Sequence, residues 1–300
     1  VIRPEGSFLS GGGWLAWPAP APYRLSVTVP APQRAVATGE LLAETAADGN
    51  YRAVFARERP GGPPVVLAGP YTVHERHGAG VRLRSYFHPE LDGQAGPYLD
   101  AAGDYIRRFS ERIGAYPFAD FHTVSAPWPV GLGFPNLSYI SRQIVPLPYM
   151  RGRSLAHEIL HNWWGNGVYV DYGRGNWAEG LTTYMADYAL AADAGPAAAR
   201  ALRLEWLRDF AALPADRDMP LRAFTSRHHD AAQMVGYRKG AFVFHMLQRR
   251  LGQAHFDTAM GHFWWTQQFR VAGWDDLQTS AEQVSGQDLT AFFQQWLERP

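Results

Sequence analysis

The feature that most constrains this chain is a pair of histidines, His157 and His161, in the run HEILH at residues 157–161. On an α-helix, residues i and i+4 lie on one face about one turn apart, so a helix here would point both imidazoles at one small cation. Such a pattern also arises by chance in helices whose histidines bind nothing. A catalytic zinc site has three protein ligands and keeps its fourth position for water. Glu179 is the predicted third ligand, which leaves Glu158 as the candidate base.

Two longer segments extend this pattern. Residues 161–166 read HNWWGN, and residues 177–184 read WAEGLTTY, which supplies a second helix start carrying the carboxylate. With both segments present, the chain resembles the gluzincin zinc aminopeptidases of the membrane alanyl aminopeptidase family, whose signature is HExxHxWxGN followed by W-x-N-E-G-[FL]-[AT]-x-Y. The resemblance implies one Zn²⁺ ion held by His157, His161 and Glu179, with Glu158 as the catalytic base.

The sequence departs from the family pattern around the third ligand. Seventeen residues separate His161 from Glu179, one fewer than usual in the family, and Ala178 stands where the family has asparagine. A deletion in the loop at residues 171–176 costs little, because loops absorb changes of length. Asp187 follows two turns after Glu179. It either orients a ligand histidine through the other ring nitrogen or is a solvated helix residue.

A tyrosine farther along the chain is a second candidate catalytic residue. Residues 236–247 read GYRKGAFVFHML, and they resemble a Y-x-K-G stretch whose tyrosine helps to hold the oxyanion in the family. A phenol at Tyr237 can donate a hydrogen bond where negative charge develops, although an isolated tyrosine at a helix start is ordinarily a packing residue. His228 and His229 are not expected to form a second metal pair, because sequence neighbours point apart. His245 is predicted to be a packed histidine.

The region of residues 130–137, VGLGFPNL, lies where the family carries its G-x-M-E-N segment. There the family's glutamate pairs with the free α-ammonium of the substrate, but alignment through Asn136 puts Pro135 at that position. The backbone of residues 131–134 is still predicted to bind an extended peptide by strand addition. These four candidate substrate-binding residues are Gly131, Leu132, Gly133 and Phe134.

We therefore predict a zinc metallopeptidase that is aminopeptidase-like. A zinc endopeptidase on the same fold and a non-catalytic peptide-binding module stay open as alternatives. If an aminopeptidase, the chain needs another carboxylate to bind the amine, and the candidates are Glu5, Glu75, Glu90 and Asp120.

The order of patterns predicts an α+β fold, because strand patterns come first and helix patterns after them. Alternation at residues 23–29, 34–42 and 51–55, with Pro- and Gly-rich joints between, predicts an antiparallel β-sandwich portion over residues 1–78. The resemblance implies that this is only the later part of a β-domain. A strand at 81–87 would open a second, mainly helical domain at 79–300, and the resemblance implies that this domain is thermolysin-like. Its predicted helices are 95–113, 196–213, 239–251 and 289–297, and its further strands are 123–126 and 137–140.

Composition narrows the partners. The 28 basic and 28 acidic residues balance, which gives no electrostatic case for nucleic acid and favours peptides or small molecules. There is no cysteine and therefore no disulfide framework. We find no apolar run long enough to span a membrane and no signal peptide. The chain begins at Val1 rather than Met, so the sequence leaves its localisation open, and an upstream signal that had been removed would favour a periplasmic or secreted protein. The 11 Trp, 14 Tyr and 16 Phe are expected to pack the core.

Overall fold

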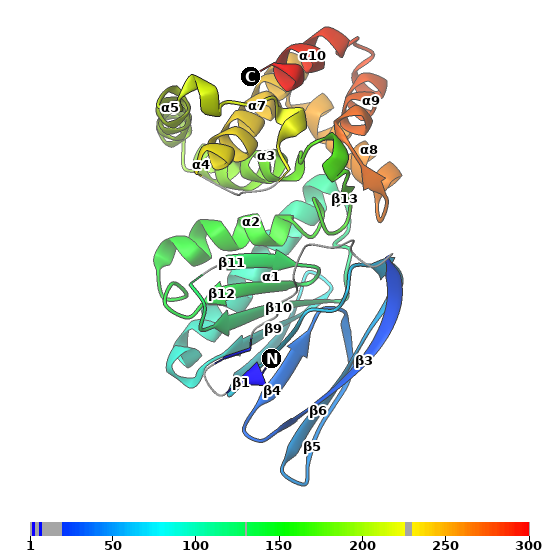
Figure 1. Cartoon of the computed structure of the whole chain (residues 1–300), viewed down its shortest axis with the longest axis vertical. Coiled ribbons are helices and arrows are strands. Elements are labelled where there is room, and N and C mark those ends of the chain that lie inside the picture. The colour runs from blue at the N-terminus through cyan, green and yellow to red at the C-terminus, as the bar shows by residue number, and fades with distance from the viewer. Residues whose placement is uncertain (1, 4–5, 8–19, 130, 226–229, 300) are drawn as a thin grey trace.

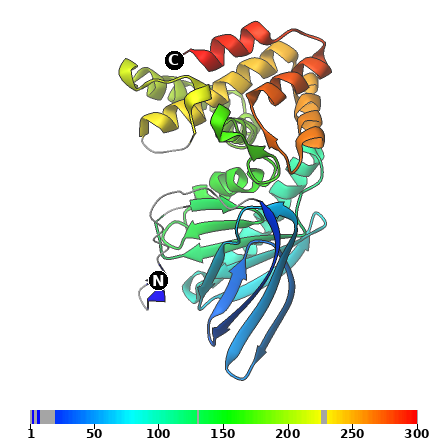
Figure 2. The ribbon, with the colours of Figure 1, turned by 45° about the vertical axis from the view of Figure 1, so that its right-hand side comes forward.

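The computed structural model describes residues 2–3, 6–7, 20–129, 131–225 and 230–299. Figure 1 shows three tiers along the long axis: N-terminal strands at the bottom, a central sheet in the middle, and helices at the top. Figure 2 shows the same order after a turn about the vertical axis. The predicted α+β fold, with strands before helices, is confirmed.

The N-terminal tier consists of antiparallel strands. β3 (Ala21–Pro30), β6 (Asn50–Gly61) and β5 (Glu40–Ala47) form a sheet in the order β3-β6-β5, and β4 (Arg34–Ala37) pairs with β7 (Val66–Gly69). Two short strands, β1 (Ile2–Arg3) and β2 (Gly6–Ser7), pair near the N-terminus. Side chains alternate along β6, where Tyr51, Ala53 and Phe55 are buried and their neighbours are more exposed. The loose strand predicted at 34–42 is two strands, and Gly39, with φ of 96°, stands at the break.

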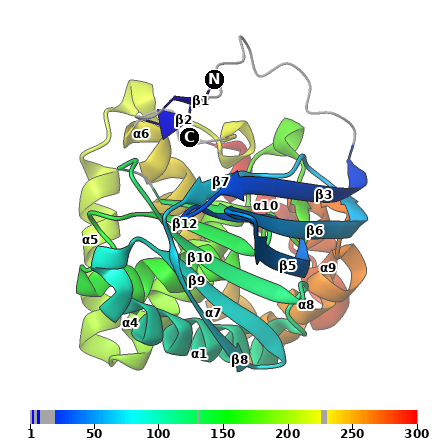
Figure 3. The same cartoon turned by 90° about the horizontal axis from the view of Figure 1, so that it is seen from below.

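The central sheet is mixed, with strand order β11-β12-β10-β9-β8. β9 (Val81–Phe87), β10 (Asp120–Ala126) and β12 (Leu137–Ser141) run parallel, while β8 (Thr72–Gly78) and β11 (Gly131–Phe134) are antiparallel edge strands. Every residue of β10 and β12 is buried, as expected for strands covered on both faces. Figure 3 shows β3, β6 and β5 lying over this sheet when the molecule is seen from below.

The pairing of β8 with β9 bears on where the two units of the chain divide. The division expected between residues 78 and 79 lies inside the turn of this hairpin, since Gly78 pairs with Val81. β8 therefore shares its sheet with β9, and not with the N-terminal strands. From this pairing we propose that the division lies between β7 and β8.

Helix α1 (Ala95–Ile113) covers the central sheet and has the bounds predicted from its apolar periodicity. It packs on β8 and β9 and against α2 (Leu155–Leu160). Its buried side includes Tyr98, Ala102, Ile106 and Phe109, and it ends at Gly114, whose φ is 136°.

The upper tier is helical. Its largest fully buried side chains include Trp163, Trp164, Trp177 and Trp274, which agrees with the aromatic core packing expected from the composition. Three π-helical segments, Met150–Ser154, Thr183–Tyr188 and Met234–Lys239, interrupt the α-helices. Short 3-10 turns lie at Pro89–Gln94, Tyr172–Arg174, Ala215–Arg217 and Leu221–Ala223, and a two-residue ladder joins β13 (Tyr169–Val170) to β14 (Val271–Ala272). The remaining helices are α3 (Ala178–Thr182), α4 (Ala189–Asp193), α5 (Pro196–Ala211), α6 (Asp230–Gln233), α7 (Gly240–Leu251), α8 (Gln253–Gln267), α9 (Trp274–Ser285) and α10 (Thr290–Glu298). Among the described residues, none of the helices is long and apolar enough to cross a bilayer.

Candidate metal centre

Helix α2 carries the histidine pair beside the sheet edge formed by β11 and β12 (Figure 1). The π-helical segment Met150–Ser154 leads into α2, and His161 is its C-terminal cap, still in helical conformation with φ of −59°. His157 and His161 therefore share a face, as their spacing predicts.

Three potential ligand atoms converge in front of α2. The Nε2 atoms of His157 and His161 lie 3.2 Å apart, and Glu179 Oε2 lies 3.6 Å from the first and 3.2 Å from the second. Glu179 comes from the first turn of α3. All three ligand atoms lie within 4.8 Å of one another.

Hydrogen bonds at the Nδ1 atoms fix the orientation and the tautomer of the two histidine rings. His161 Nδ1 lies 2.9 Å from the carbonyl oxygen of Trp164, which only accepts, so this nitrogen must carry a proton. His157 Nδ1 lies 2.7 Å from the carboxylate of Asp187 and is its donor. In the neutral imidazoles each Nε2 atom then carries a lone pair, and both lie near the Glu179 oxygen, which has no hydrogen-bond partner among the described groups. Three converging acceptors need a cation between them, and two imidazoles with one carboxylate are a donor set that suits Zn²⁺.

The charges around the site also favour a cation between these three groups. Burial lowers the pKa of His157, but the carboxylate of Asp187 outweighs it and holds that pKa well above the ordinary value. Burial likewise opposes protonation of His161, whose pKa the Glu179 carboxylate raises. Burial would raise the pKa of Glu179, yet the two histidines hold it well below its usual range. The carboxylates thus stabilise positive charge at the histidines, as protons or as a metal ion.

Asp187 is buried behind the site. Its second carboxylate oxygen accepts a 2.7 Å bond from Arg153 Nε, so the carboxylate is held between Arg153 and His157. Of the two alternatives left open by the sequence, the structure favours the orienting residue over a solvated one. Arg153 had no signal in the sequence analysis.

Glu158 lies against the edge strand β11. A Cβ added at Gly133 would lie only 2.6 Å from Glu158 Oε2, so the strand's backbone approaches this carboxylate as closely as a glycine permits. Burial raises the pKa of Glu158, with the two histidines acting in the opposite sense. The candidate base and the predicted peptide-binding strand are therefore neighbours.

Tyr237 is also next to the centre. Its ring stacks on that of His157 with centroids 6.1 Å apart and planes 8° apart. It belongs to the π-helical segment that runs into α7. A close contact of two glycines sets this arrangement, because a Cβ on Gly180 would lie 2.8 Å from the Cα of Gly240. Gly180 follows the predicted ligand Glu179, and Gly240 closes the Y-x-K-G stretch.

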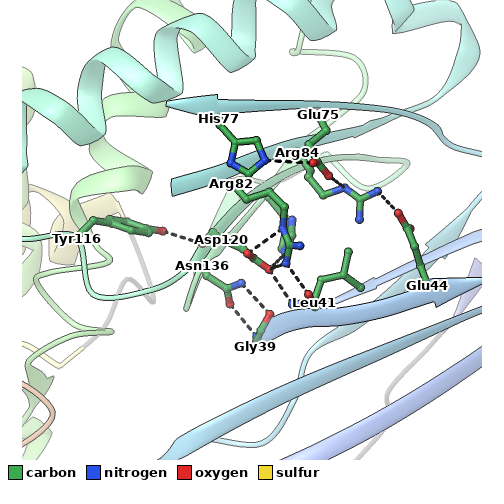
Figure 4. Close-up of polar contacts among 11 residues, drawn as sticks. Gly39, Leu41, Glu44, Glu75, His77, Arg82, Arg84, Tyr116, Asp120 and Asn136 are labelled. Carbon is green, nitrogen blue, oxygen red and sulfur yellow. Dashed lines mark hydrogen bonds and ion pairs between the residues drawn. The ribbon is translucent and has the colours of Figure 1, made fainter. Parts of the chain in front are cut away.

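A buried polar cluster ties the end of β11 to the rest of the molecule. Asn136 Oδ1 accepts from Gly39 N at 2.8 Å, and Asn136 Nδ2 donates to Gly39 O at 3.0 Å, which Figure 4 shows. Asn136 N donates to Asn162 Oδ1 at 2.8 Å, and Asn162 directly follows the histidine pair. The sequence analysis used Asn136 only for alignment and gave Asn162 no role. In the same cluster Asp120 accepts from Arg82 and from Leu41 N (Figure 4).

The residues considered as replacements for the missing amine-binding glutamate are engaged elsewhere. Asp120 is buried in the cluster just described, Glu75 pairs with Arg84 at 3.2 Å, and Glu90 lies 3.8 Å from Arg142. Glu5, His228 and His229 lie outside the described residues. His245 packs against the rings of Tyr184 and Tyr188, which confirms it as a packed histidine.

Comparison with known proteins agrees with this geometry. Residues 152–296 match the peptidase family M1 domain. Aminopeptidase N of Lactococcus lactis subsp. lactis is 26% identical over 183 residues, which cover 55% of this chain and 20% of that protein. Aminopeptidase M1 of Arabidopsis thaliana is 22% identical over 309 residues, covering 93% of this chain and 34% of that protein. The chain thus spans a fifth to a third of the length of these relatives.

Solved structures extend the likeness to most of the chain. An M1 zinc metallopeptidase from Deinococcus radiodurans superposes with a TM-score of 0.74 at 22% identity, covering 93% of this chain and 64% of that one. A mutant of a two-domain M1 zinc metallopeptidase, bound to L-arginine, gives a TM-score of 0.76 at 23% identity and covers 94% of this chain and 65% of that one. At these identities the likeness establishes the fold.

Proposed function

We propose that this chain, whose residues 152–296 match the peptidase family M1 domain, is a zinc-dependent metallopeptidase of that family with its centre at His157, His161 and Glu179. One observation carries the proposal. Two imidazole nitrogens and a carboxylate converge within 4.8 Å, and the Glu158 carboxylate lies against Gly133 of the edge strand β11. No other arrangement of potential ligands among the described residues brings three such groups together.

The metal would supply Lewis acidity, which lowers the pKa of a water molecule and polarises the scissile carbonyl. The protein residues then divide the remaining work. Glu158 takes the proton of the attacking water and later delivers it to the leaving amine. Asp187 keeps the Nδ1 proton of His157 in place, which would leave Nε2 to hold the metal.

Substrate binding would use the edge of the central sheet. Among the described strands β11 pairs only with β12, and we propose that its other edge takes an extended peptide. A peptide paired there would carry its scissile bond past Glu158, because Gly133 and the Glu158 carboxylate are in near contact. Tyr237, stacked on His157, would donate a hydrogen bond to the oxygen that gains charge.

We propose removal of N-terminal residues as the reaction, as the names of the relatives suggest. One observation favours the endopeptidase alternative: Pro135 has no carboxylate to bind a free amine, and Asp120, Glu75 and Glu90 are held in other contacts. The two reactions differ in whether the substrate needs a free α-ammonium group.

A matched pair of peptides, one with a free N-terminus and one acetylated, tests both steps of the proposal. Zinc-loaded protein should cleave the free peptide one residue at a time and leave the acetylated one intact. A Glu158→Gln variant, which keeps the shape of the side chain but cannot take a proton, is the control. Internal cleavage of both peptides would identify an endopeptidase. Failure of zinc-loaded protein to exceed the control with either peptide would overturn the catalytic proposal and favour a peptide-binding module.

A further inference from the structure

A pocket of about 570 Å³ lies where the N-terminal strands meet the catalytic half of the chain. None of the proposed ligands lines it, nor do Glu158 and Tyr237. Its walls combine two phenylalanine rings with three guanidinium groups, and Tyr23 also lines it. The phenylalanine rings and guanidinium groups are those of Phe118, Phe269, Arg24, Arg57 and Arg59. Pockets of this volume are large enough for a small organic ligand.

Arg57 is the unusual member of this lining. Its side chain is nine-tenths buried, with 8% exposed, yet no carboxylate of the described residues lies within 4.0 Å of it. Its Nη2 donates to the phenol oxygen of Tyr169 at 2.8 Å, while its Nε has no partner within the described part of the chain. The Tyr169 phenol in turn donates to the carbonyl of Pro60, so it is a neutral partner. A buried charge is normally compensated by an opposite one, and none of the described carboxylates provides that compensation.

The guanidinium groups of Arg57 and Arg59 lie over the rings of Phe118 and Phe269. The Arg59 guanidinium carbon lies 4.3 Å from the ring centroid of Phe269, and that of Arg57 lies 5.8 Å from the centroid of Phe118. The two rings contact each other edge to face at 6.3 Å. Arg59 makes no ion pair with any described carboxylate either. Arg57 and Arg59, two residues apart on β6, thus present guanidinium groups that have no described carboxylate partner over one apolar surface.

The acidic groups of the pocket do not cancel this charge. Asp120 already accepts from Arg82 and from the backbone of Leu41. Glu40 and Glu58 line the pocket, and each lies more than 4.0 Å from every described cationic group. The three guanidinium groups therefore exceed the two remaining carboxylates by one charge.

We propose that this pocket binds a small carboxylate with an apolar body, its charge facing Arg57 and Arg59 and its body against Phe118 and Phe269. The planar guanidinium matches a carboxylate in shape and hydrogen-bond geometry. Gly39 and Asn136 also line the pocket. The ligand would consequently sit beside the hydrogen bonds that fix the end of β11 to the N-terminal strands.

Calorimetric titration of zinc-loaded protein tests the proposal, with N-acetyl-L-phenylalanine as the probe. Its acetylated amine keeps it from resembling an aminopeptidase substrate. We expect it to bind at least tenfold more tightly than N-acetyl-L-phenylalaninamide, which has the same body without the charge. Equal binding of acid and amide would overturn the proposal. Inorganic phosphate should bind more weakly than the acid, and phosphate binding of equal strength would refute the role of the apolar wall.

Variants locate the site. Arg59→Gln removes one exposed guanidinium and should weaken binding roughly tenfold to a hundredfold, as expected for one charge-assisted contact. Arg57→Gln should weaken it further, but it removes a buried side chain, so Arg59→Gln decides the question. The matched control is Arg52→Gln on the same strand, because Arg52 is exposed and does not line the pocket. Identical affinities of the Arg59 and Arg52 variants would refute the assignment.

A final comparison separates this pocket from the metal centre. Removal of zinc with a chelator should leave the affinity for N-acetyl-L-phenylalanine unchanged, whereas loss of binding would mean that the probe had bound at the metal. The proposal is independent of peptide hydrolysis, and a protein that fails to cleave peptides can still pass every arm of this test.

Discussion

Replacing Gly133 with alanine should impair catalysis while leaving the fold intact. The new Cβ would lie 2.6 Å from Glu158 Oε2, whereas ordinary contacts begin at 3.4 Å, so the carboxylate must move by about 0.8 Å. Its side chain is flexible and can move at small cost, and alanine is compatible with the strand because Gly133 has no positive φ. We expect the stability to change by no more than about 1 kcal/mol. Misplacement of a catalytic group by about 1 Å can cost on the order of 100-fold in rate.

The assay compares kcat of Gly133→Ala with that of Gly131→Ala, both loaded with zinc. At Gly131 the nearest atom to an added Cβ is 3.9 Å away, so this variant measures the effect of a methyl group on the same strand without the clash. We expect kcat of the Gly133 variant to fall roughly 100-fold below that of the Gly131 variant, about 2.7 kcal/mol in activation free energy. Urea unfolding and zinc content should be the same for both. Equal kcat values would refute the placement of Glu158 against β11.

Three further predictions concern the shell around the centre. Asp187→Asn removes the charge that orients His157, so zinc affinity should fall roughly 10- to 100-fold in a chelator competition, while Asp193→Asn, an exposed carboxylate, should bind zinc normally. Because the pKa values of His157 and His161 are raised, the metal-free histidines hold protons that zinc must displace, and zinc affinity should weaken as pH falls. Calorimetry in buffers of different ionisation enthalpy should detect about one to two protons released per zinc ion bound. Zinc binding without proton release would contradict the argument. Asn136→Ala leaves the backbone N–H and C=O of Gly39 without their partner and should lower the free energy of unfolding by roughly 2–4 kcal/mol. The control Asn50→Ala, at an exposed residue, should change it little. Equal urea midpoints for the two variants would show that the buried hydrogen bonds contribute little to stability.

Local patterns predicted the local structure well. The bounds of α1 follow from apolar residues recurring every three or four positions, and α7 begins within one residue of its prediction. The pairing of His157 with His161 is equally local, since a helix alone places them on one face. These features depend on the helical period and on little else.

Features that depend on distant partners were beyond such patterns. Asn136 bonds to Gly39, 97 residues away, and nothing near either residue marks the pair. The loose alternation of residues 34–42 hides a break at Gly39, and β8 joins the central sheet because of its pairing with β9. The π-helical segments likewise left no trace in the periodicity. Strand partners and buried bonds are set by tertiary packing, so only the structure gives them.

The glycine contact between α3 and α7 links the spacing of the centre to its chemistry. Gly180 and Gly240 touch through their backbones, and each is a short step along the chain from a proposed functional group, Glu179 or Tyr237. The distance between Glu179 and Tyr237 therefore depends on the absence of side chains at Gly180 and Gly240, where α3 and α7 cross. Any larger side chain at Gly180 would act as a wedge, moving the carboxylate and the phenol apart without altering either one.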